Sequence, residues 1–459
     1  MNAPEKAVQE LVKRARVLKP RRAAAPMAGD ASMPSEDAFA LAFVEIHGRT
    51  YRYVPQWHRW LKWDGTRWRE DSTAHMYADI RELVRVTVEG QKAERSTANA
   101  AFVSGVERLL RTDQRIVVLP EQLDAAPQDL NTPSGIVDLR SGATRPHDPA
   151  ALHTRVTSAG TDSNEGAGLW RQFLQDITAG DAELIAYLQR VAGYFLTGCT
   201  SEDVLVYLFG IGANGKSSFA EALAHALGDY AKAFPPEVLM ESKGERHPTE
   251  LAQFMGVRFA LTSEPGSQAA WNDSRLKALT GDTTISARFM RGDFFTFERT
   301  HKTMVLGNHM PRLADVSHAI RRRVQMVPFR AVFEPTPGLG MRERLKTEAG
   351  GAILAWAIEG AKLWAERGTA PPAAVLDMTA DYLADQDVLG QWLDERCERG
   401  AKFSERSSSL YKSHSAWCER SGTRPESIVR FAEKMVAAGF EKRHTAVGKL
   451  FYGIRLKQE

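Results

Sequence analysis

The stretch Gly210-Ile211-Gly212-Ala213-Asn214-Gly215-Lys216-Ser217 decides the fold of this 459-residue chain, because it fits the phosphate-loop pattern GxxxxGKS/T at every position. The continuous apolar run of residues 204–209 stands directly before it, and helical spacing follows over residues 218–227. Such an apolar run is typical of a strand that is buried in a parallel sheet. Strand, loop and helix in this order predict an α/β protein with a central parallel sheet.

The residue types of this stretch explain how it would hold a nucleotide. Its glycines allow backbone N–H groups to turn toward phosphate oxygens, and the start of the following helix adds partial positive charge. Lys216 would reach the β- and γ-phosphates of ATP, and the Ser217 hydroxyl would bind Mg²⁺. A glycine-rich turn without a ligand is the alternative, but it leaves the flanking strand and helix unexplained. We therefore expect ATP to contact Gly210, Gly212, Ala213, Asn214, Gly215, Lys216, Ser217 and Ser218.

Three further features follow the loop in an order that suits ATP hydrolysis. An apolar run over 258–263 precedes Glu264, whose carboxylate can hold magnesium-bound water or polarise the attacking water. A second run, 303–307, precedes Asn308, an amide that can orient water beside the γ-phosphate. The arginine run that follows could supply an arginine finger, which is a guanidinium that stabilises transition-state charge at the nucleotide of a neighbouring subunit. Each feature alone is more often a cap or a solvated face, but together they favour an ATPase with the catalytic residues Lys216, Glu264, Asn308, Arg322 and Arg323.

The region around these features resembles the helicase core of the phage/plasmid primase–helicase family, a branch of the superfamily 3 AAA+ helicases. The likeness rests on Lys277-Ala278-Leu279-Thr280-Gly281-Asp282, Ile285-Ser286-Ala287-Arg288, Lys302, Asn308-His309-Met310-Pro311 and Arg322-Arg323. Upstream, Tyr194-Phe195-Leu196-Thr197-Gly198 and parts of residues 136–149 are also similar to that family. The resemblance covers roughly residues 125–335 well.

This resemblance implies an AAA+ P-loop core that assembles into a hexameric ring and threads one DNA strand, moving 3′ to 5′. It places Lys216 and Ser217 in Walker A, Glu264 in Walker B and Asn308 at sensor 1, with ATP and Mg²⁺ as cofactors. The metal ligands would be Ser217 and Glu264. Many Walker B strands end in two acids, whereas Ser263 precedes Glu264 here. Between Arg322 and Arg323 the sequence does not choose the arginine finger.

Contacts with DNA inside the ring are also implied by the resemblance. Residues 288–293 would form a hairpin that points into the pore, with Arg288 and Arg291 on phosphates and Phe289 or Phe294 against the strand. Lys277 belongs to the same region of the family pattern. An ordinary exposed hairpin is the alternative.

The C-terminal segment adds a second candidate surface for DNA. Residues 401–459 carry twelve Lys and Arg against six acids. The segment 391–459 fits a winged helix, with helices over 407–421 and 425–439 and a wing over 444–456. A protein-docking or ring-stabilising helical cap is the alternative. In the winged-helix interpretation the phosphate contacts would come from Lys442, Arg443 and Lys449.

The chain is too long for one ordinary core, so we expect several domains. They are a basic disordered tail (1–34), an α+β N-terminal, collar-like domain (35–160), the ATPase core with a helical lead-in (165–340), a helical segment (341–390) and the winged-helix domain (391–459). The N-terminal domain contains Trp57, Trp60, Trp63 and Trp68. A small tryptophan core is the main interpretation, and stacking of single-stranded DNA on some of these rings is the alternative.

Composition disfavours several other classes. The three cysteines form no CxxC pair, so neither a disulfide framework nor a Cys-based zinc site is expected. No apolar run predicts a membrane span and no signal peptide is recognisable, which indicates the cytoplasm of a bacterial host cell. Residues 36–160 show no DxD pair, and Asp385-Gln386-Asp387 falls in a helical linker. We therefore expect no primase activity, and a separate primase as a partner.

The combined prediction is a replicative helicase of a phage, plasmid or other mobile element, with single-stranded DNA in the pore and origin duplex as a further partner. Two alternatives stay open: an initiator that melts or marks an origin without processive unwinding, and a DNA-binding protein whose ATP binding only assembles the ring. A kinase is disfavoured, because Asn308 and the arginine pair would have no role in it.

Overall fold

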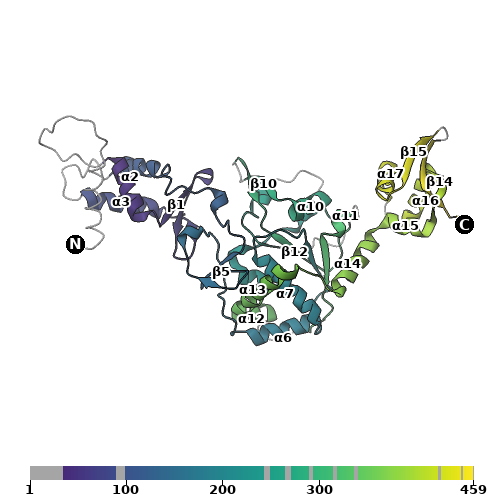
Figure 1. Cartoon of the computed structure of the whole chain (residues 1–459), viewed down its shortest axis with the longest axis horizontal. Helices are drawn as coiled ribbons and strands as arrows, with labels where there is room; N and C mark the ends of the chain where they lie inside the picture. Colours follow the sequence, from purple (N-terminus) through teal and green to yellow (C-terminus); the bar gives the residue numbers. More distant parts are fainter. Residues whose placement is uncertain are drawn as a thin grey trace.

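The computed structural model describes residues 35–88, 99–241, 249–263, 270–288, 293–313, 318–334, 340–421, 425–445 and 448–457, apart from the side chains of 318 and 319. These residues form three bodies that follow one another along the longest axis of the molecule (Figure 1). The expected tail over 1–34 and the predicted site residues Glu264, Phe289 and Arg291 lie outside the described residues.

The middle body is built on a five-stranded parallel sheet in the order β13-β7-β12-β9-β8. Its strands are β7 (Leu205–Phe209), β8 (Ala231–Ala233), β9 (Phe259–Ser263), β12 (Lys302–Gly307) and β13 (Val324–Pro328). The predicted α/β fold with a central parallel sheet is therefore confirmed. Because β7 lies between β13 and β12, the loop that follows β7 opens beside the carboxyl ends of its neighbours, where ligands bind in such sheets.

Helices cover both faces of this sheet. Side chains of β7 alternate, so Val206 and Leu208 pack on one face while Leu205 and Tyr207 pack on the other. The first face carries α6 (Ala167–Thr178), α7 (Ala182–Leu196), α8 (Lys216–Leu227), α12 (Met341–Glu348) and α13 (Gly350–Arg367). The second carries α10 (Asp273–Gly281) and α14 (Ala373–Gln386). No helix within the described ranges is long and apolar enough to cross a membrane.

The first body combines helices with a small antiparallel sheet. Its elements are α2 (Glu36–His47), β1 (Tyr51–Val54), β2 (Arg59–Trp63), β3 (Trp68–Glu70), α3 (His75–Val88) and α5 (Ala100–Leu110). Trp68 is buried, and its Nε1 donates a hydrogen bond to the Pro149 carbonyl oxygen at 2.9 Å. Trp60 is partly buried and donates to Glu107 Oε1 at 2.7 Å. These two tryptophans therefore belong to the core, as the main interpretation predicted.

A short three-stranded sheet joins the first body to the middle one. It consists of β4 (Asp129–Thr132), β5 (Gly135–Asp138) and β6 (Thr144–Arg145). Leu130 of β4 packs in the apolar core of the middle body. Arg258, directly before β9, donates to the carbonyl oxygens of Asp129 at 2.8 Å and Leu196 at 2.6 Å. One buried guanidinium thus ties β4 to the end of α7 and to the central sheet.

The third body is C-terminal and has its own apolar core around Trp392, Phe431 and Phe451. Its elements are α15 (Val388–Arg396), β14 (Cys397–Arg406), α16 (Ser407–Arg420), α17 (Ile428–Ala437), β15 (Glu441–Thr445) and β16 (Gly448–Leu456). The two predicted helices and the two-stranded ribbon are present, close to their predicted ranges.

Strand β14 corrects the expectation that only helices precede the ribbon. Its sequence is mostly polar, so no alternating apolar pattern signals a strand. Pairing with β16 stabilises it in a three-stranded antiparallel sheet, in the order β14-β16-β15. Arg455 of β16 reinforces the pairing, since its guanidinium lies 2.6 Å from Glu398 and 3.9 Å from the ring centroid of Phe403. Long-range pairing, rather than local pattern, makes this segment a strand.

Candidate nucleotide-binding site

The loop between β7 and α8 is shaped by two close approaches at glycine. A Cβ at Gly210 would lie 1.9 Å from Asn214 Nδ2 and 2.5 Å from the Phe329 carbonyl oxygen. Gly215 has a φ of 82°, and a Cβ there would lie 2.3 Å from Ile177 Cγ2 on α6. Packing thus leaves no room for a side chain at either position. The shape of the loop depends on contacts with segments outside the motif.

Lys216 begins α8 and directs its ammonium group back across the loop. Its Nζ donates hydrogen bonds to the Gly210 carbonyl oxygen at 2.9 Å and to Asn214 Oδ1 at 3.3 Å. It also donates to Asn308 Oδ1, on the amide that follows β12. These three acceptors are uncharged, and only 6% of the Lys216 surface is exposed. A phosphate oxygen would accept a stronger, charge-assisted hydrogen bond from this buried ammonium group.

Strands β9 and β12 end at the same edge of the sheet as β7. Leu306 of β12 faces Ser263 of β9, and Gly307 faces Phe209 of β7. This register brings Asn308 to the phosphate loop and leaves Ser263 at the edge of the site. Glu264, the next residue, lies outside the described residues.

A cavity of about 560 Å³ opens at this edge. That volume is ordinary for a small-molecule site. The cavity is lined by Gly212, Ala213, Asn214, Gly215, Lys216, Ser217, Ser218, Glu221, Ser263, Leu306, Asn308 and Arg342. The predicted loop residues from Gly212 to Ser218 and the amide of Asn308 therefore share one space, whereas Gly210 is not among the lining residues.

Two of the lining residues, Glu221 and Arg342, were missed in the sequence. Glu221 lies one helical turn after Ser217, so the period of α8 could have placed it on the same side of the helix. Arg342 lies at the start of α12, on a segment that follows the whole sheet. No local pattern connects it with the phosphate loop.

The predicted magnesium ligand Ser217 lines the same cavity. Within the described ranges, no group of three or more His, Cys, Asp and Glu side chains is placed to hold a metal ion. Magnesium at nucleotide sites takes one or two protein oxygens and completes its shell with phosphates and water. A single hydroxyl beside the loop therefore fits magnesium that arrives with a nucleotide.

Asp203, in the segment before β7, lies beside both candidate finger arginines. Its Oδ2 is 3.2 Å from Arg323 Nη2 and 3.6 Å from Arg322 Nη2. The two side chains differ in exposure, with 9% for Arg323 and 57% for Arg322. Arg321 instead pairs with Asp387 at 3.1 Å on the surface. Of the pair, Arg322 is therefore the one whose side chain is largely open to solvent.

Lys302, one of the residues behind the resemblance, lies at the opposite end of β12 from Asn308. It is buried, its Nζ donates a hydrogen bond to the Thr197 carbonyl oxygen, and the ammonium lies 4.9 Å from the Tyr194 ring centroid. Burial lowers the pKa of Lys302 well below its usual range, and the nearby Arg258 lowers it further. Lys302 therefore stabilises the end of α7 and is no candidate for a phosphate contact.

Strands β10 (Thr284–Arg288) and β11 (Phe294–Glu298) pair antiparallel on either side of the predicted hairpin range 288–293, of which residues 289–292 lie outside the described residues. Arg288 faces Phe294 across the pair, and its guanidinium lies 5.3 Å from that ring centroid. Phe294 is 62% exposed. Among the other predicted DNA contacts, Lys277 is half-buried on α10, and Phe289 and Arg291 are outside the described residues.

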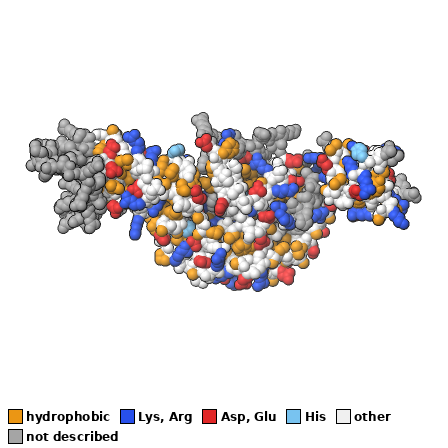
Figure 2. All heavy atoms as spheres, turned by 45° about the horizontal axis from the view of Figure 1, so that its top comes forward, with side chains coloured by type: hydrophobic (Ala, Val, Ile, Leu, Met, Phe, Trp, Pro, Cys, Tyr) orange, Lys and Arg blue, Asp and Glu red, His pale blue; other side chains and the backbone are white. Residues whose placement is uncertain are grey.

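The predicted DNA contacts of the third body lie on its ribbon. Arg443 pairs with Glu441 at 2.6 Å, so this guanidinium already has a carboxylate partner. The Lys442 ammonium lies 5.7 Å from the Phe451 ring centroid, and Lys449 is exposed. Figure 2 shows Lys and Arg side chains on the surface of this body.

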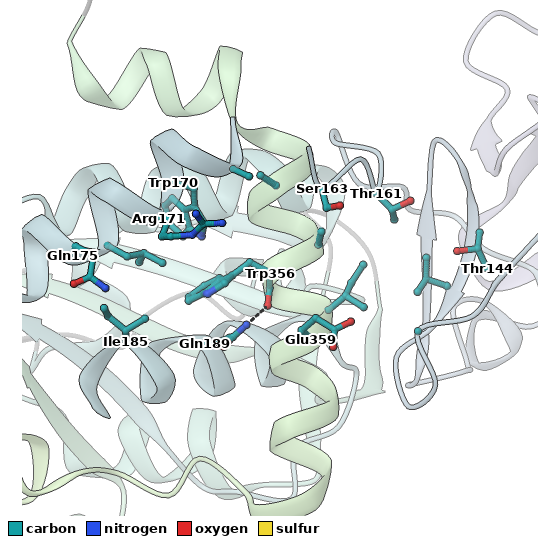
Figure 3. A pocket seen from close by; sticks show the side chains of 17 residues that line it. Thr144, Thr161, Ser163, Trp170, Arg171, Gln175, Ile185, Gln189, Trp356 and Glu359 are labelled. Carbon is teal, nitrogen blue, oxygen red and sulfur yellow. Dashed lines mark hydrogen bonds between the residues drawn. The ribbon is translucent and has the colours of Figure 1, made fainter. Parts of the chain in front are cut away.

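A second cavity, of about 660 Å³, lies between α6, α7 and α13 (Figure 3). Trp170 and Trp356 form apolar walls, while Arg171 and Glu359 contribute opposite charges. Gln189 Nε2 donates a hydrogen bond to the Trp356 carbonyl oxygen at 2.9 Å. None of the predicted site residues that the structure describes lines this cavity, so it is separate from the phosphate-loop site.

Two family models match this chain. One, described as D5 N terminal like, matches residues 40–179. The other, a family of unknown function (DUF5906), matches residues 208–323. The second span contains the phosphate loop, Asn308 and the arginine pair.

Two viral proteins, each with the name "Putative helicase", are similar to this chain. The first, from Acanthamoeba polyphaga mimivirus, is 30% identical over 206 residues, which are 44% of this chain and 21% of that protein. The second, from Frog virus 3 (isolate Goorha), is 27% identical over 267 residues, which are 53% of this chain and 27% of that protein. The chain thus spans about a fifth to a quarter of the length of these relatives.

Solved structures of the NrS-1 C-terminal region are also similar. Its A form without ligand matches with a TM-score of 0.47 and 9% identity, over 87% of this chain and 94% of that chain. A second apo structure of the region matches with a TM-score of 0.47 and 10% identity, over 89% and 96% of the two chains.

Proposed function

Because this chain belongs to the phage and viral primase–helicase family, we propose that it is a ring-shaped, ATP-dependent DNA helicase for the replication of a phage, plasmid or other mobile element. One observation carries the proposal: Lys216 Nζ donates a hydrogen bond to Asn308 Oδ1 at the wall of a cavity of about 560 Å³. A phosphate loop alone suits any nucleotide-binding protein. A strand-end amide in contact with its lysine suits hydrolysis, because the amide can orient water beside the γ-phosphate.

We assign ATP to this cavity, in a core of AAA+ type. Lys216 binds the phosphates, and the backbone N–H groups of the loop surround them. Glu264 polarises the attacking water and Asn308 orients it. Ser217, with Glu264 as the second predicted ligand, would hold Mg²⁺, which would supply positive charge to neutralise the phosphate oxygens.

The assembly proposed is a homo-hexamer in which each subunit completes its neighbour's site. Arg322 is the better candidate for the finger, because 57% of its side chain is exposed while that of Arg323 is 9% exposed. Arg323 is buried and pairs with Asp203, so its proposed role is to stabilise the position of this segment. A guanidinium from the adjacent subunit would stabilise the charge that develops during phosphoryl transfer.

DNA is the proposed second partner, single-stranded in the pore and duplex at an origin. The β10–β11 hairpin presents an exposed aromatic ring, Phe294, next to a guanidinium, which suits stacking and phosphate contact. In the third body, the order of helices, β14 and ribbon supports a winged helix. The proposed contacts are Lys277, Arg288, Phe289, Arg291, Lys442, Arg443 and Lys449.

ATP hydrolysis with and without single-stranded DNA tests this function. Turnover stimulated by DNA should be present in the wild-type chain and lost in Lys216→Ala and in Arg322→Ala. Mixing the two variants should restore part of the turnover, because some interfaces then combine an intact Lys216 with an intact Arg322. Arg321→Ala is the matched control, since that arginine pairs with Asp387 instead.

Displacement of a strand from a tailed duplex separates the helicase from its alternatives. A chain that hydrolyses ATP but displaces no strand would be an origin-melting initiator. A chain that binds both ATP and DNA without turnover would be an ATP-switched binding protein, and the motor proposal would be wrong.

A further inference from the structure

The cavity at the phosphate loop contains a charge pair that the proposed function does not use. Arg342 Nη1, at the start of α12, lies 3.1 Å from Glu221 Oε1 on α8. Both side chains line the cavity together with Lys216 and Ser217. A guanidinium and a carboxylate therefore border the space in which a triphosphate would lie.

Arg342 and Glu221 can each exchange the other for a different charged partner. The side chain of Arg342 is 46% exposed and that of Glu221 is 33% exposed. An ion pair with this much solvent contact contributes little to stability, so its partners can separate at small cost. Glu221 would keep a cation after such an exchange, because Lys346 Nζ lies 3.5 Å from its Oε2.

We propose that Arg342 binds the phosphates of the nucleotide in its own subunit and exchanges Glu221 for phosphate oxygens when the nucleotide enters. A guanidinium presents paired N–H donors that match phosphate geometry. A triphosphate also carries more negative charge than one carboxylate, so it is the stronger partner. Lys216 contacts the nucleotide from the loop side and Arg342 from the α12 side. This inference rests on the proposed function, since it takes ATP as the ligand of the cavity.

The exchange gives the helices that follow the sheet a direct contact with the nucleotide. α12 packs on α8, and the chain continues at once into α13, which packs on α7 and α8. Arg342 is therefore placed to report an occupied site to the helical layer on one face of the sheet.

Titration calorimetry of the full chain with Mg²⁺ and a non-hydrolysable ATP analogue tests the contact. Arg342→Ala should weaken binding about ten-fold, the worth of one charge-assisted hydrogen bond. Arg342→Lys keeps the charge without the paired donors and should recover part of the loss. Glu221→Gln removes the competing carboxylate and should bind the analogue at least as tightly as the wild-type chain. Weaker binding by Glu221→Gln would overturn the exchange.

Lys346→Ala is the matched control, because Lys346 pairs with the same carboxylate but does not line the cavity. Its affinity should stay within about two-fold of the wild-type value. If Lys346→Ala weakens binding as much as Arg342→Ala, or if Arg342→Ala binds normally, the inference is wrong. Lys216→Ala distinguishes this failure from that of the proposed function. If the wild-type chain does not bind the analogue, or if Lys216→Ala binds it as well as the wild-type chain, then ATP is not the ligand of this cavity and the proposed function is wrong.

Discussion

Lys216 Nζ and Asn308 Oδ1 are joined by a hydrogen bond between the start of α8 and the residue that follows β12. The amide therefore holds the ammonium group at the wall of the cavity. In the proposed function, a phosphate would replace the amide as the partner of the ammonium group, and the amide would then be available to bind water. In the proposed ATPase, this hydrogen bond would connect nucleotide binding with the orientation of the attacking water.

Asn308→Ala should separate binding from hydrolysis. Lys216 keeps hydrogen bonds to the Gly210 carbonyl oxygen and Asn214 Oδ1, so affinity for ATP should change little. Turnover should fall about 100-fold, since correct placement of one water contributes on that order. Steady-state hydrolysis and nucleotide titration on the same preparation provide the two measurements. An equal loss in both would mean that Asn308 only positions the lysine.

Arg323→Ala and Arg322→Ala should differ in stability. Loss of the buried Arg323 leaves Asp203 without its closest partner, and should cost on the order of 2 kcal/mol of unfolding free energy, discounted for the partial exposure of Asp203. Loss of the exposed Arg322 should leave stability within about 0.5 kcal/mol of the wild-type value. Chemical unfolding of both variants measures the difference.

Asp203→Asn serves as the control for this pair of variants. It removes the charge that both arginines share, so it should lower stability by an amount similar to Arg323→Ala. If Arg322→Ala proves as destabilising as Arg323→Ala, the exposed arginine has a structural task and its assignment as the finger fails.

The parts of the site that sequence reasoning located are those whose signals are local. The strand, the loop and the helix of the phosphate site are contiguous, from β7 to α8, and each has its own pattern over a few residues. Asn308 was found in the same way, because it directly follows an apolar strand. The prediction of a helicase came from the resemblance to a known family. Residue spacing in the chain would not have given it alone.

What could not be predicted depends on contacts between distant segments. Asp203 and Arg323 are 120 residues apart, and nothing in either neighbourhood indicates the other. The pair of Glu221 and Arg342 likewise exists only because α12 packs on α8. β14 is polar along its length and becomes a strand through pairing with β16. A sequence pattern over a few consecutive residues contains no information about contacts between such distant segments.

Lys442→Ala combined with Lys449→Ala should lower the salt dependence of DNA binding. Each lost phosphate contact reduces the slope of log affinity against log salt by about 0.7 to 0.9. Arg443→Ala should have a smaller effect, because Glu441 already neutralises that guanidinium at 2.6 Å. Glu441→Gln should conversely strengthen binding by freeing Arg443. Fluorescence anisotropy across a salt series measures the slope for the wild-type chain and for each of these three variants. An unchanged slope in the double variant would favour the protein-docking cap over the winged helix.

His414 makes the stability of the third body dependent on pH. It is 2% exposed, and its ring centroid lies 5.3 Å from that of Trp392 and 5.0 Å from that of Phe431. Burial lowers the pKa of His414 to about 4, and Lys434 adds to the effect. In the unfolded chain the pKa of a histidine is about 6.5, so between these values the unfolded state binds more protons. The contribution of neutral, buried His414 to stability is therefore complete above about pH 6.5 and is lost as the pH falls toward 4.

Between pH 7 and pH 5 this proton uptake should cost the third body on the order of 2 kcal/mol. Scanning calorimetry of the full chain should show its C-terminal transition at a lower temperature at pH 5 than at pH 7. In His414→Gln the side chain no longer titrates, so the shift between the two pH values should shrink, whatever the substitution does to stability at pH 7. His444→Gln, on the exposed ribbon, should keep the wild-type shift. A shift that survives intact in His414→Gln would assign the acid sensitivity to other groups, because proton uptake by His414 cannot then be its cause.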